Sequence, residues 1–240
     1  MNSIKGIHDL VEDRLKSWSQ GLAPYINHLV KNDLHWRTLP RVIDALGTCV
    51  RLEQKSKLYL GAIFEMLYLA DHIHCQVRDD EEGQEHNEEL QFSILIGDYI
   101  FGESVKMLGE IEGYQLLGLF SELICFINEG HVKNKLATGV NLEVLEAEKA
   151  SFYRYAFLIT ACLAGLPREE GRIWEEAGNC LGMAVVLHDH RIFVLGLEYL
   201  ERARAMLSHV IGDEVRSEVF EPLFEAMSLM NSTTPQVAIL

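Results

Sequence analysis

Two short runs of the sequence hold residue types that bind metal ions or transfer protons. Residues 71–82 begin with Asp-His-Ile-His-Cys and end in four consecutive acidic residues, and residues 188–190 are His-Asp-His. Acidic residues three or four positions apart share a helix face and can bind a divalent cation together. Histidine is a common zinc ligand and proton carrier. Both runs are therefore candidate metal or acid–base sites.

Each run also has a structural explanation. The acidic residues 79–82 stand beside a polar stretch, where runs of charge are usually exposed to water. Neighbouring residues on a helix point about 100° apart, so His188 and His190 do not match a metal-binding pair four positions apart. A zinc site there would need partners from elsewhere, such as His72 or His74. The spacing favours polar residues that line a cavity or a subunit contact.

Helices must position these residues, because apolar residues recur at helical spacings along much of the chain. We predict helices over residues 58–76, 91–109, 114–128, 144–165, 174–195 and 198–210. No segment alternates apolar and polar residues between turn signals, so no sheet is expected. The stretch from Phe152 to Gly165 is apolar almost all round, which is typical of a helix in the middle of a bundle.

The fold class that follows is all-α, as a single-domain antiparallel helix bundle. No stretch is long or biased enough to separate two domains. Residues 83–89 predict a polar connection, and Pro167 and Gly212 mark breaks between helices. We therefore expect one helical domain over residues 1–230 and a flexible tail over residues 231–240.

Composition narrows the possible functions. The chain has 240 residues, of which 48% are hydrophobic, and this is enough for a sizeable core. Its 21 basic and 36 acidic residues give a formal net charge of −15, so nucleic acid is not an expected partner. Five scattered cysteines without a C-x-x-C pair favour a cytoplasmic location. No transmembrane segment is expected, because the longest weakly polar run, residues 155–167, is too short.

Several short motifs follow one another along the chain. Residues 65–79 align without a gap with the pattern E-x-x-H-x-x-x-L-x-H-D-D-x-x-D. Residues 97–101, Gly-Asp-Tyr-Ile-Phe, are like the helix pattern G-D-x-L-F, and residues 129–130 match the start of an E-G-E segment. Residues 149–150, Lys-Ala, stand in the place of a Lys-Thr pair.

Two further motifs complete this order. The segment from Gly178 through Leu181-Gly182 to Asp189 is like the pattern G-x-x-L-G-x-A-F-Q-x-x-D-D-x-x-D, with Asp189 in the place of its first aspartate. Residues 34–40 are like the pattern G-G-K-R-x-R-P. With all these motifs in sequence, the chain resembles the all-trans isoprenyl (polyprenyl) diphosphate synthases. The resemblance implies their isoprenoid-synthase helix bundle, in which two aspartate-rich motifs hold Mg²⁺ ions that clamp an allylic diphosphate.

The metal-binding positions depart from the family pattern. The first motif keeps only its last aspartate, Asp79, because residues 75–76 are Cys and Gln. The second motif keeps Asp189, whereas His190 and Phe193 replace its other aspartates. Mg²⁺ requires hard oxygen ligands. We therefore expect no catalytic residue and no metal ligand beyond these two vestigial aspartates, with His74, His188 and His190 as speculative ligands.

The diphosphate-binding positions depart as well. Trp36 and Leu39 replace a lysine and an arginine of the G-G-K-R-x-R-P stretch, and Tyr68 replaces the histidine of E-x-x-H. The resemblance leaves Arg37 and Lys149 as vestigial substrate-binding cations. Two diphosphate substrates carry about six negative charges, which two cations do not offset without metal.

The chain is also shortened near its C-terminal third, because residues 193–197 join the second motif almost directly to the last helices. In these respects it resembles the short non-catalytic subunit of heteromeric heptaprenyl and hexaprenyl diphosphate synthases. That resemblance implies a catalytic polyprenyl diphosphate synthase subunit as partner, Mg²⁺ bound by that partner, and no cofactor bound by this chain alone. It also implies a homo- or heterodimer that forms through the helices within residues 91–128. The implied role is to set the length of the prenyl product, such as the side chain of menaquinone.

Two alternatives remain open. The first is a divergent prenyltransferase-like enzyme with a metal or acid–base site in the old cavity, built from His72, His74, His188, Asp189 and His190. A stoichiometric transition metal would favour it. The second is a homodimeric isoprenoid-binding protein without a synthase partner, and an apolar ligand that co-purifies with a homodimer would favour that hypothesis.

Overall fold

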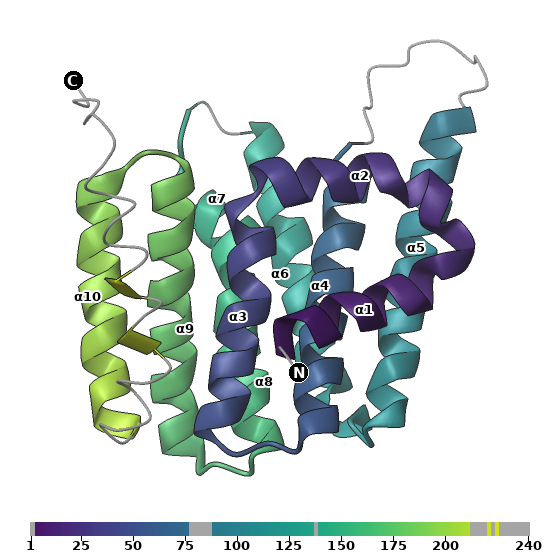
Figure 1. The fold of residues 1–240 in the computed structure, drawn as a ribbon. Helices are drawn as coiled ribbons and strands as arrows, with labels where there is room; N and C mark the ends of the chain where they lie inside the picture. Colours follow the sequence, from purple (N-terminus) through teal and green to yellow (C-terminus); the bar gives the residue numbers. More distant parts are fainter. Residues whose placement is uncertain (1–2, 77–87, 137–138, 212–219, 222–223, 226–240) are drawn as a thin grey trace. The chain divides into compact units, whose positions relative to one another are not determined.

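The computed structural model describes residues 3–76, 88–136, 139–211, 220–221 and 224–225. These residues form helices joined by short connections, and none of them is in a strand (Figure 1). The predicted all-α class is confirmed. None of the described helices is long and apolar enough to cross a membrane.

Contacts divide the chain into two compact units. The N-terminal unit comprises residues 1–44 and 54–114, and the C-terminal unit comprises residues 45–53 and 115–240. The predictions of a single domain over residues 1–230 and of a flexible tail stay predictions, and the tail lies outside the described residues. Most of the polar connection over 83–89 and the break at Gly212 also lie outside them.

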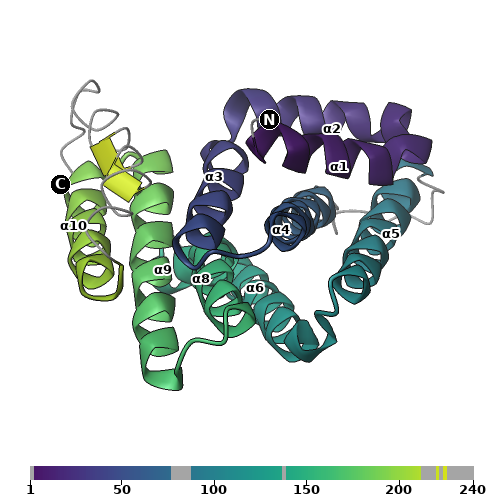
Figure 2. The same ribbon diagram turned by 60° about the horizontal axis from the view of Figure 1, so that its bottom comes forward.

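The N-terminal unit is built around one buried helix, α4 (Gln54–His74). Every residue from Leu60 to Ala70 on this helix is buried. Figure 2 looks nearly along α4 and shows the helices of this unit around it. They are α1 (Ser3–Leu15), the short η1 (Lys16–Trp18), α2 (Ser19–Asn32), the first part of α3 (Leu34–Cys49), and α5 (Glu88–Glu110). Helix α4 has no solvent-exposed face over three turns, and it contacts α1, α2 and α5.

The C-terminal unit is an antiparallel set of helices. After η2 (Tyr114–Leu116) come α6 (Leu117–Leu136), α7 (Leu142–Leu145), the π-helix η3 (Glu146–Ala150), α8 (Ser151–Leu163), α9 (Arg168–Asp189) and α10 (Phe193–Val210). Helix α9 packs against both α8 and α10. Most of α8 is buried, including Phe152, Tyr153 and Phe157, as its all-round apolar sequence predicts.

Two glycines allow α9 to approach its neighbours closely. A Cβ atom added at Gly178 would lie 2.8 Å from the backbone oxygen of Tyr153, and one at Gly182 would lie 2.7 Å from that of Ala150. Both distances are too short for real atoms, and backbone atoms cannot move aside cheaply. The glycines in the G-x-x-L-G stretch therefore have a packing function.

The predicted helix over 174–195 is wrong in extent, because α9 ends at Asp189 and α10 starts at Phe193. Arg191 takes the left-handed conformation, with a φ of 62°. Its amide donates to His188 O at 2.9 Å, and the amide of Ile192 donates to Leu187 O at 2.8 Å. This pair of bonds closes a helix C-terminus in a Schellman motif, usually with glycine in the left-handed position. Since this position is an arginine here, the sequence gives no indication that α9 ends at Asp189.

Candidate functional site

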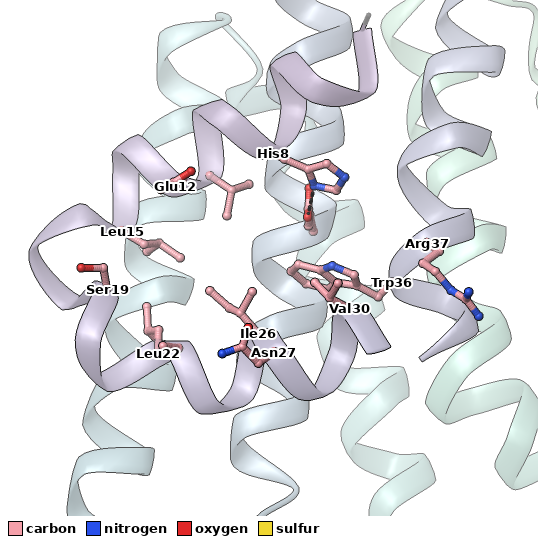
Figure 3. Close-up of a pocket in the computed structure, with 13 residues that line it drawn as sticks. His8, Glu12, Leu15, Ser19, Leu22, Ile26, Asn27, Val30, Trp36 and Arg37 are labelled. Atoms are coloured by element: carbon pink, nitrogen blue, oxygen red, sulfur yellow. Dashed lines mark hydrogen bonds and ion pairs between the residues drawn. The ribbon is translucent and has the colours of Figure 1, made fainter. Parts of the chain in front are cut away.

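Glu65, the first residue of the E-x-x-H pattern, forms a buried pair with His8 of α1. The Glu65 side chain is only 1% exposed, and its Oε1 lies 2.6 Å from His8 Nδ1 (Figure 3). Burial raises the pKa of Glu65, and the hydrogen bond to Glu65 raises the pKa of His8. This position therefore joins α4 to α1.

Tyr68, in the position of the motif histidine, connects α4 to the start of α3. Its hydroxyl donates to Asp33 Oδ2 at 2.8 Å, and its ring stacks against His35 with a centroid distance of 6.1 Å. The other carboxylate oxygen of Asp33 accepts the backbone N–H of Trp36 at 2.8 Å, as an N-cap does. Tyr68 thus holds the helix end that carries Arg37.

The predicted cation Arg37 lies in the first turn of α3 and is exposed. Its Nε donates to the backbone oxygen of Asp33 at 3.4 Å. Trp36 and Leu39, which replace the lysine and arginine of the family pattern, are 6% and 1% exposed. Both side chains are therefore buried at positions where the family has cations.

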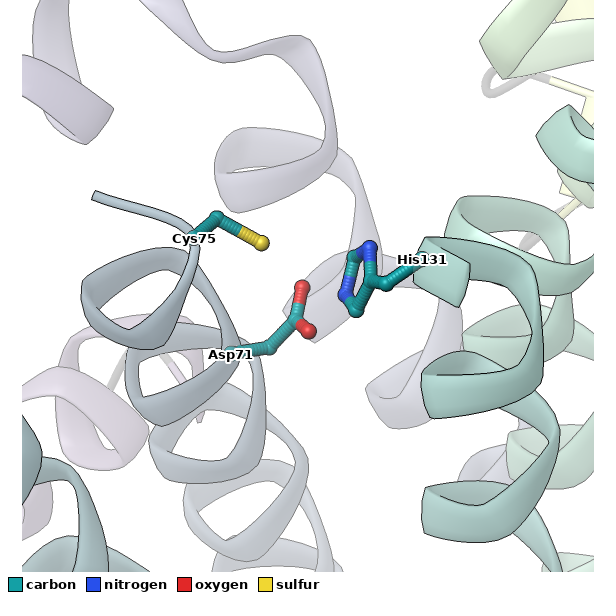
Figure 4. Close-up of side chains that lie close together, drawn as sticks. All are labelled: Asp71, Cys75 and His131. Atoms are coloured by element: carbon teal, nitrogen blue, oxygen red, sulfur yellow. The ribbon is translucent and has the colours of Figure 1, made fainter. Parts of the chain in front are cut away.

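The leading positions of the first aspartate motif lie just past the end of α4. Cys75 and Gln76 form an exposed turn, in which the amide of Cys75 donates to Asp71 O at 2.9 Å. Figure 4 shows the side chains of Asp71 and Cys75 on one face of this helix end. Asp79 lies outside the described residues.

The histidines of this run contact different partners. The His72 ring stacks on His28 of α2, with centroids 5.6 Å apart and an interplanar angle of 17°. His74 Nε2 lies 3.5 Å from Asp98 Oδ1 on α5, between side chains that are 42% and 69% exposed. Asp98 belongs to the G-D-x-L-F-like segment. The two histidines are thus engaged with α2 and α5.

Lys149 lies in the π-helix η3 of the C-terminal unit. Two carboxylates in this short element have partners: Glu146 Oε1 accepts from Asn179 Nδ2 at 2.9 Å, and Glu148 Oε1 lies 3.0 Å from His131 Nδ1 of α6. A π-helical turn is rare and is frequently found at functional sites. Sequence reasoning missed the turn and its carboxylates, because a π-helix has no distinct apolar spacing.

A neighbouring glycine explains the motif at residues 129–130. A Cβ atom at Gly130 would lie 2.9 Å from Glu148 Cγ and 3.0 Å from Glu148 N. Only glycine lets α6 approach η3 at this point without displacement. The side chain of His131, the next residue of α6, is drawn in Figure 4.

The second motif lies at the C-terminal end of α9. Asp189 and His190 are exposed, and His188 is half-buried with its ring 5.3 Å from that of Phe193. Phe193 is 6% exposed and belongs to the core. In the described part of each unit, none of His72, His74, His188, Asp189 and His190 gathers with two further potential ligands.

The chain is similar in sequence to known prenyl diphosphate synthases. It is 23% identical over 246 residues to octaprenyl diphosphate synthase of Escherichia coli strain K12, and the match covers 97% of this chain and 73% of that relative. It is 25% identical over 105 residues to decaprenyl-diphosphate synthase subunit 2 of Schizosaccharomyces pombe, which covers 43% of this chain and 33% of that one. No protein-family model matches the chain.

Solved structures of the same class have this fold. A decaprenyl diphosphate synthase from Rhodobacter capsulatus superposes with a TM-score of 0.77 at 15% identity, over 97% of each chain. Heptaprenyl diphosphate synthase from Staphylococcus aureus superposes with a TM-score of 0.73 at 14% identity, over 98% of each chain. The fold is therefore the all-α fold of the isoprenoid synthases. Relatives and structural neighbours are all-trans polyprenyl diphosphate synthases, which confirms the resemblance of the motifs.

Proposed function

We propose that this chain is a non-catalytic subunit of a heteromeric long-chain trans-polyprenyl diphosphate synthase. A catalytic partner would supply both aspartate motifs and the Mg²⁺ ions, and this chain would set the length of the product. The complex would act in the cytoplasm, and its product would serve as the side chain of a quinone. The observation that carries the proposal is that residues in the family's motif positions hold the fold together. Glu65 pairs with His8, Tyr68 binds Asp33, and Phe193 lies in the core.

The donor set argues against a magnesium clamp in this chain. Cys75 offers a thiol and Gln76 an amide where the family has aspartates, and Mg²⁺ prefers carboxylates and water in octahedral geometry. Phe193 offers no ligand atom at all. Among the described residues, Asp189 is the one aspartate left at a motif position. The residues at these positions therefore do not fit bound Mg²⁺.

The diphosphate-binding positions support the same proposal. Trp36 and Leu39 have buried apolar side chains instead of cationic ones, so these two positions offer no positive charge to a diphosphate. The exposed Arg37 and the half-buried Lys149 are the cations that remain at matching positions. Prenyl transfer requires stabilisation of the departing diphosphate, and two cations without a metal are a poor means of supplying it.

A surface of α5 supports the expectation of a partner. Ile94, Leu95 and Phe101 are 41%, 69% and 38% exposed, and the first and last are one heptad apart. Contiguous exposed apolar patches are typical of protein–protein contacts, and we infer that these residues contribute to one. They lie within the predicted dimerisation segment 91–128. The name of the fission-yeast relative, a decaprenyl-diphosphate synthase subunit, also agrees with a role in a heteromer.

Co-expression tests the proposal. A tagged form of this chain is expressed with a full-length polyprenyl diphosphate synthase from the same genome, and the purified complex is assayed for prenyl transfer and product length. Leu95→Asp should abolish co-purification, because it places a charge in the apolar α5 surface. Val194→Asp is the matched control, since Val194 of α10 is 62% exposed and lies outside that surface. Failure of the wild-type chains to associate would contradict the proposal.

A further inference from the structure

The N-terminal unit contains a cavity of about 530 Å³ that none of the sequence motifs predicts (Figure 3). It lies between α1 and α2 and is bordered by the first turn of α3 and by Glu65 of α4. Much of its wall is apolar, with side chains including Val11, Leu15, Leu22, Ile26 and Val30. Its volume falls within the range of small-molecule sites, about 300 to 1,000 Å³.

One end of the cavity is polar. Figure 3 shows His8 and Trp36 at this end and Leu15 and Leu22 at the other. Glu65, which lines the cavity, has one carboxylate oxygen bonded to His8, while its second, buried oxygen has no hydrogen-bond partner among the described residues. A buried acceptor without a partner costs free energy that a donor from a ligand would recover.

Trp36 supplies the complementary group. Its side chain lines the cavity and is 94% buried, since it is 6% exposed. The backbone N–H of Trp36 caps α3 through Asp33. Its indole N–H, a donor with no acceptor capacity, makes no hydrogen bond within the described residues. The polar end therefore has one donor, the Trp36 indole N–H, and one buried acceptor, the second oxygen of Glu65, and neither makes a hydrogen bond within the described residues.

The charges around the cavity decide which head group fits. The wall contains the carboxylate of Glu12 and the Glu65–His8 pair, whereas the guanidinium of Arg37 points away from the cavity in Figure 3. A diphosphate would bring only acceptors and negative charge to this wall. A hydroxyl group is neutral, and it donates one hydrogen bond and accepts another.

We propose that this cavity binds an elongated, neutral apolar alcohol, whose hydroxyl donates to Glu65 and accepts from the Trp36 indole, and whose hydrocarbon chain lies along Leu15, Leu22 and Ile26. The site uses the motif positions Trp36 and Glu65 and does not rest on the proposed subunit role. A synthase subunit and an independent binding protein would both carry it.

Three ligands with the same hydrocarbon chain test the head group. Farnesol, farnesyl methyl ether and farnesyl diphosphate are titrated into the purified full-length chain, and binding is followed by isothermal titration calorimetry and by native mass spectrometry. We expect farnesol to bind with one-to-one stoichiometry. The ether, which accepts but cannot donate, should bind about 3- to 10-fold more weakly, as for the loss of one hydrogen bond. The diphosphate should bind more weakly still.

Two variants locate the site. Ala23 lines the cavity from α2 at an exposed position, so Ala23→Trp should fill the space and abolish farnesol binding. Ala205→Trp, at an exposed position of α10, is the matched control and should bind as the wild type does. Trp36→Phe removes the indole N–H and should weaken both farnesol and the ether about 3- to 10-fold, because the oxygen of each accepts from this donor.

Three results would overturn the proposal: no binding of farnesol by the wild-type chain, equal binding by wild type and a folded Ala23→Trp, or a diphosphate that binds as tightly as the alcohol. Circular dichroism checks that each variant is folded. If Ala23→Trp does not fold, the comparison of the three ligands on wild type and Trp36→Phe still decides the outcome.

Discussion

The hydroxyl of Tyr68 donates a hydrogen bond to Asp33 at 2.8 Å, so the position that the family fills with a histidine here joins α4 to the start of α3. Asp33 also caps α3 through the backbone of Trp36. One carboxylate thereby orders the helix end that bears Arg37.

Removing that hydroxyl tests the role of the pair. Tyr68→Phe keeps the ring, which stacks on His35, and removes a hydrogen bond to a carboxylate. We expect the free energy of unfolding in urea to fall by about 1 to 2 kcal/mol. Tyr114→Phe is the control, because Tyr114 is 64% exposed, and it should leave the stability unchanged. Equal stability of the two variants would show that the Tyr68 bond has no such role.

The buried pair of His8 and Glu65 should make stability depend on pH. The hydrogen bond to Glu65 raises the pKa of His8, so its stabilisation is complete below the unfolded value near 6.5 and is lost as pH rises through the folded value. Burial raises the pKa of Glu65, which also makes the folded state less favourable as pH rises. Both groups therefore act in the same direction.

Glu65→Gln removes both effects. We expect the free energy of unfolding of the wild type to decrease between pH 5 and 8 more steeply than that of Glu65→Gln, measured in urea at each pH. Glu143→Gln, at an exposed position of α7, is the control and should follow the wild type. Parallel curves for wild type and Glu65→Gln would contradict this account of the pair.

The stop of α9 predicts a stabilising substitution. Arg191 holds a φ of 62°, which costs a residue with a Cβ atom free energy that glycine does not lose. Arg191→Gly should raise the stability by about 0.5 to 1 kcal/mol, after allowance for the greater freedom of glycine in the unfolded chain. Arg202→Gly, inside α10, should lower it by about 1 kcal/mol. A loss of stability in Arg191→Gly would argue against the Schellman geometry.

Close helix packing at Gly182 predicts that replacing this glycine lowers the stability, whereas introducing a glycine at Arg191 raises it. Gly182→Ala would place a Cβ atom 2.7 Å from the backbone oxygen of Ala150, and we expect a loss of about 1 to 3 kcal/mol in thermal or urea unfolding. Gly171→Ala, earlier in the same helix, meets no atom of the described residues within 4 Å and should be neutral or slightly stabilising. If Gly182→Ala is as stable as Gly171→Ala, α9 does not approach η3 as closely as described.

Apolar spacing predicted the long helices α4, α5, α6, α8 and α9, because each has a wide buried surface that the sequence shows directly. It did not predict the stop of α9 or the π-helix η3. Arg191 does not look like a helix terminator, and residues 146–150 are compatible with an ordinary helix. Local sequence therefore determines where helices exist more clearly than where they end.

The motif positions illustrate a second limit. Alignment with the family pattern identifies which residues are replaced, such as Tyr68 and Trp36, and only the structure shows what the replacements do. The cavity was missed for a similar reason. His8, Leu22, Trp36 and Glu65 come from four separate helices, and no spacing in the sequence indicates that they share one space.

Prenyl transfer by the purified chain tests the central claim most directly. The chain is incubated with an allylic diphosphate, isopentenyl diphosphate and Mg²⁺, first alone and then with a full-length polyprenyl diphosphate synthase from the same genome. The proposed role predicts no product from the chain alone, and a higher rate or a longer product from the mixture than from the partner alone. Sustained turnover by the chain without a partner would contradict it.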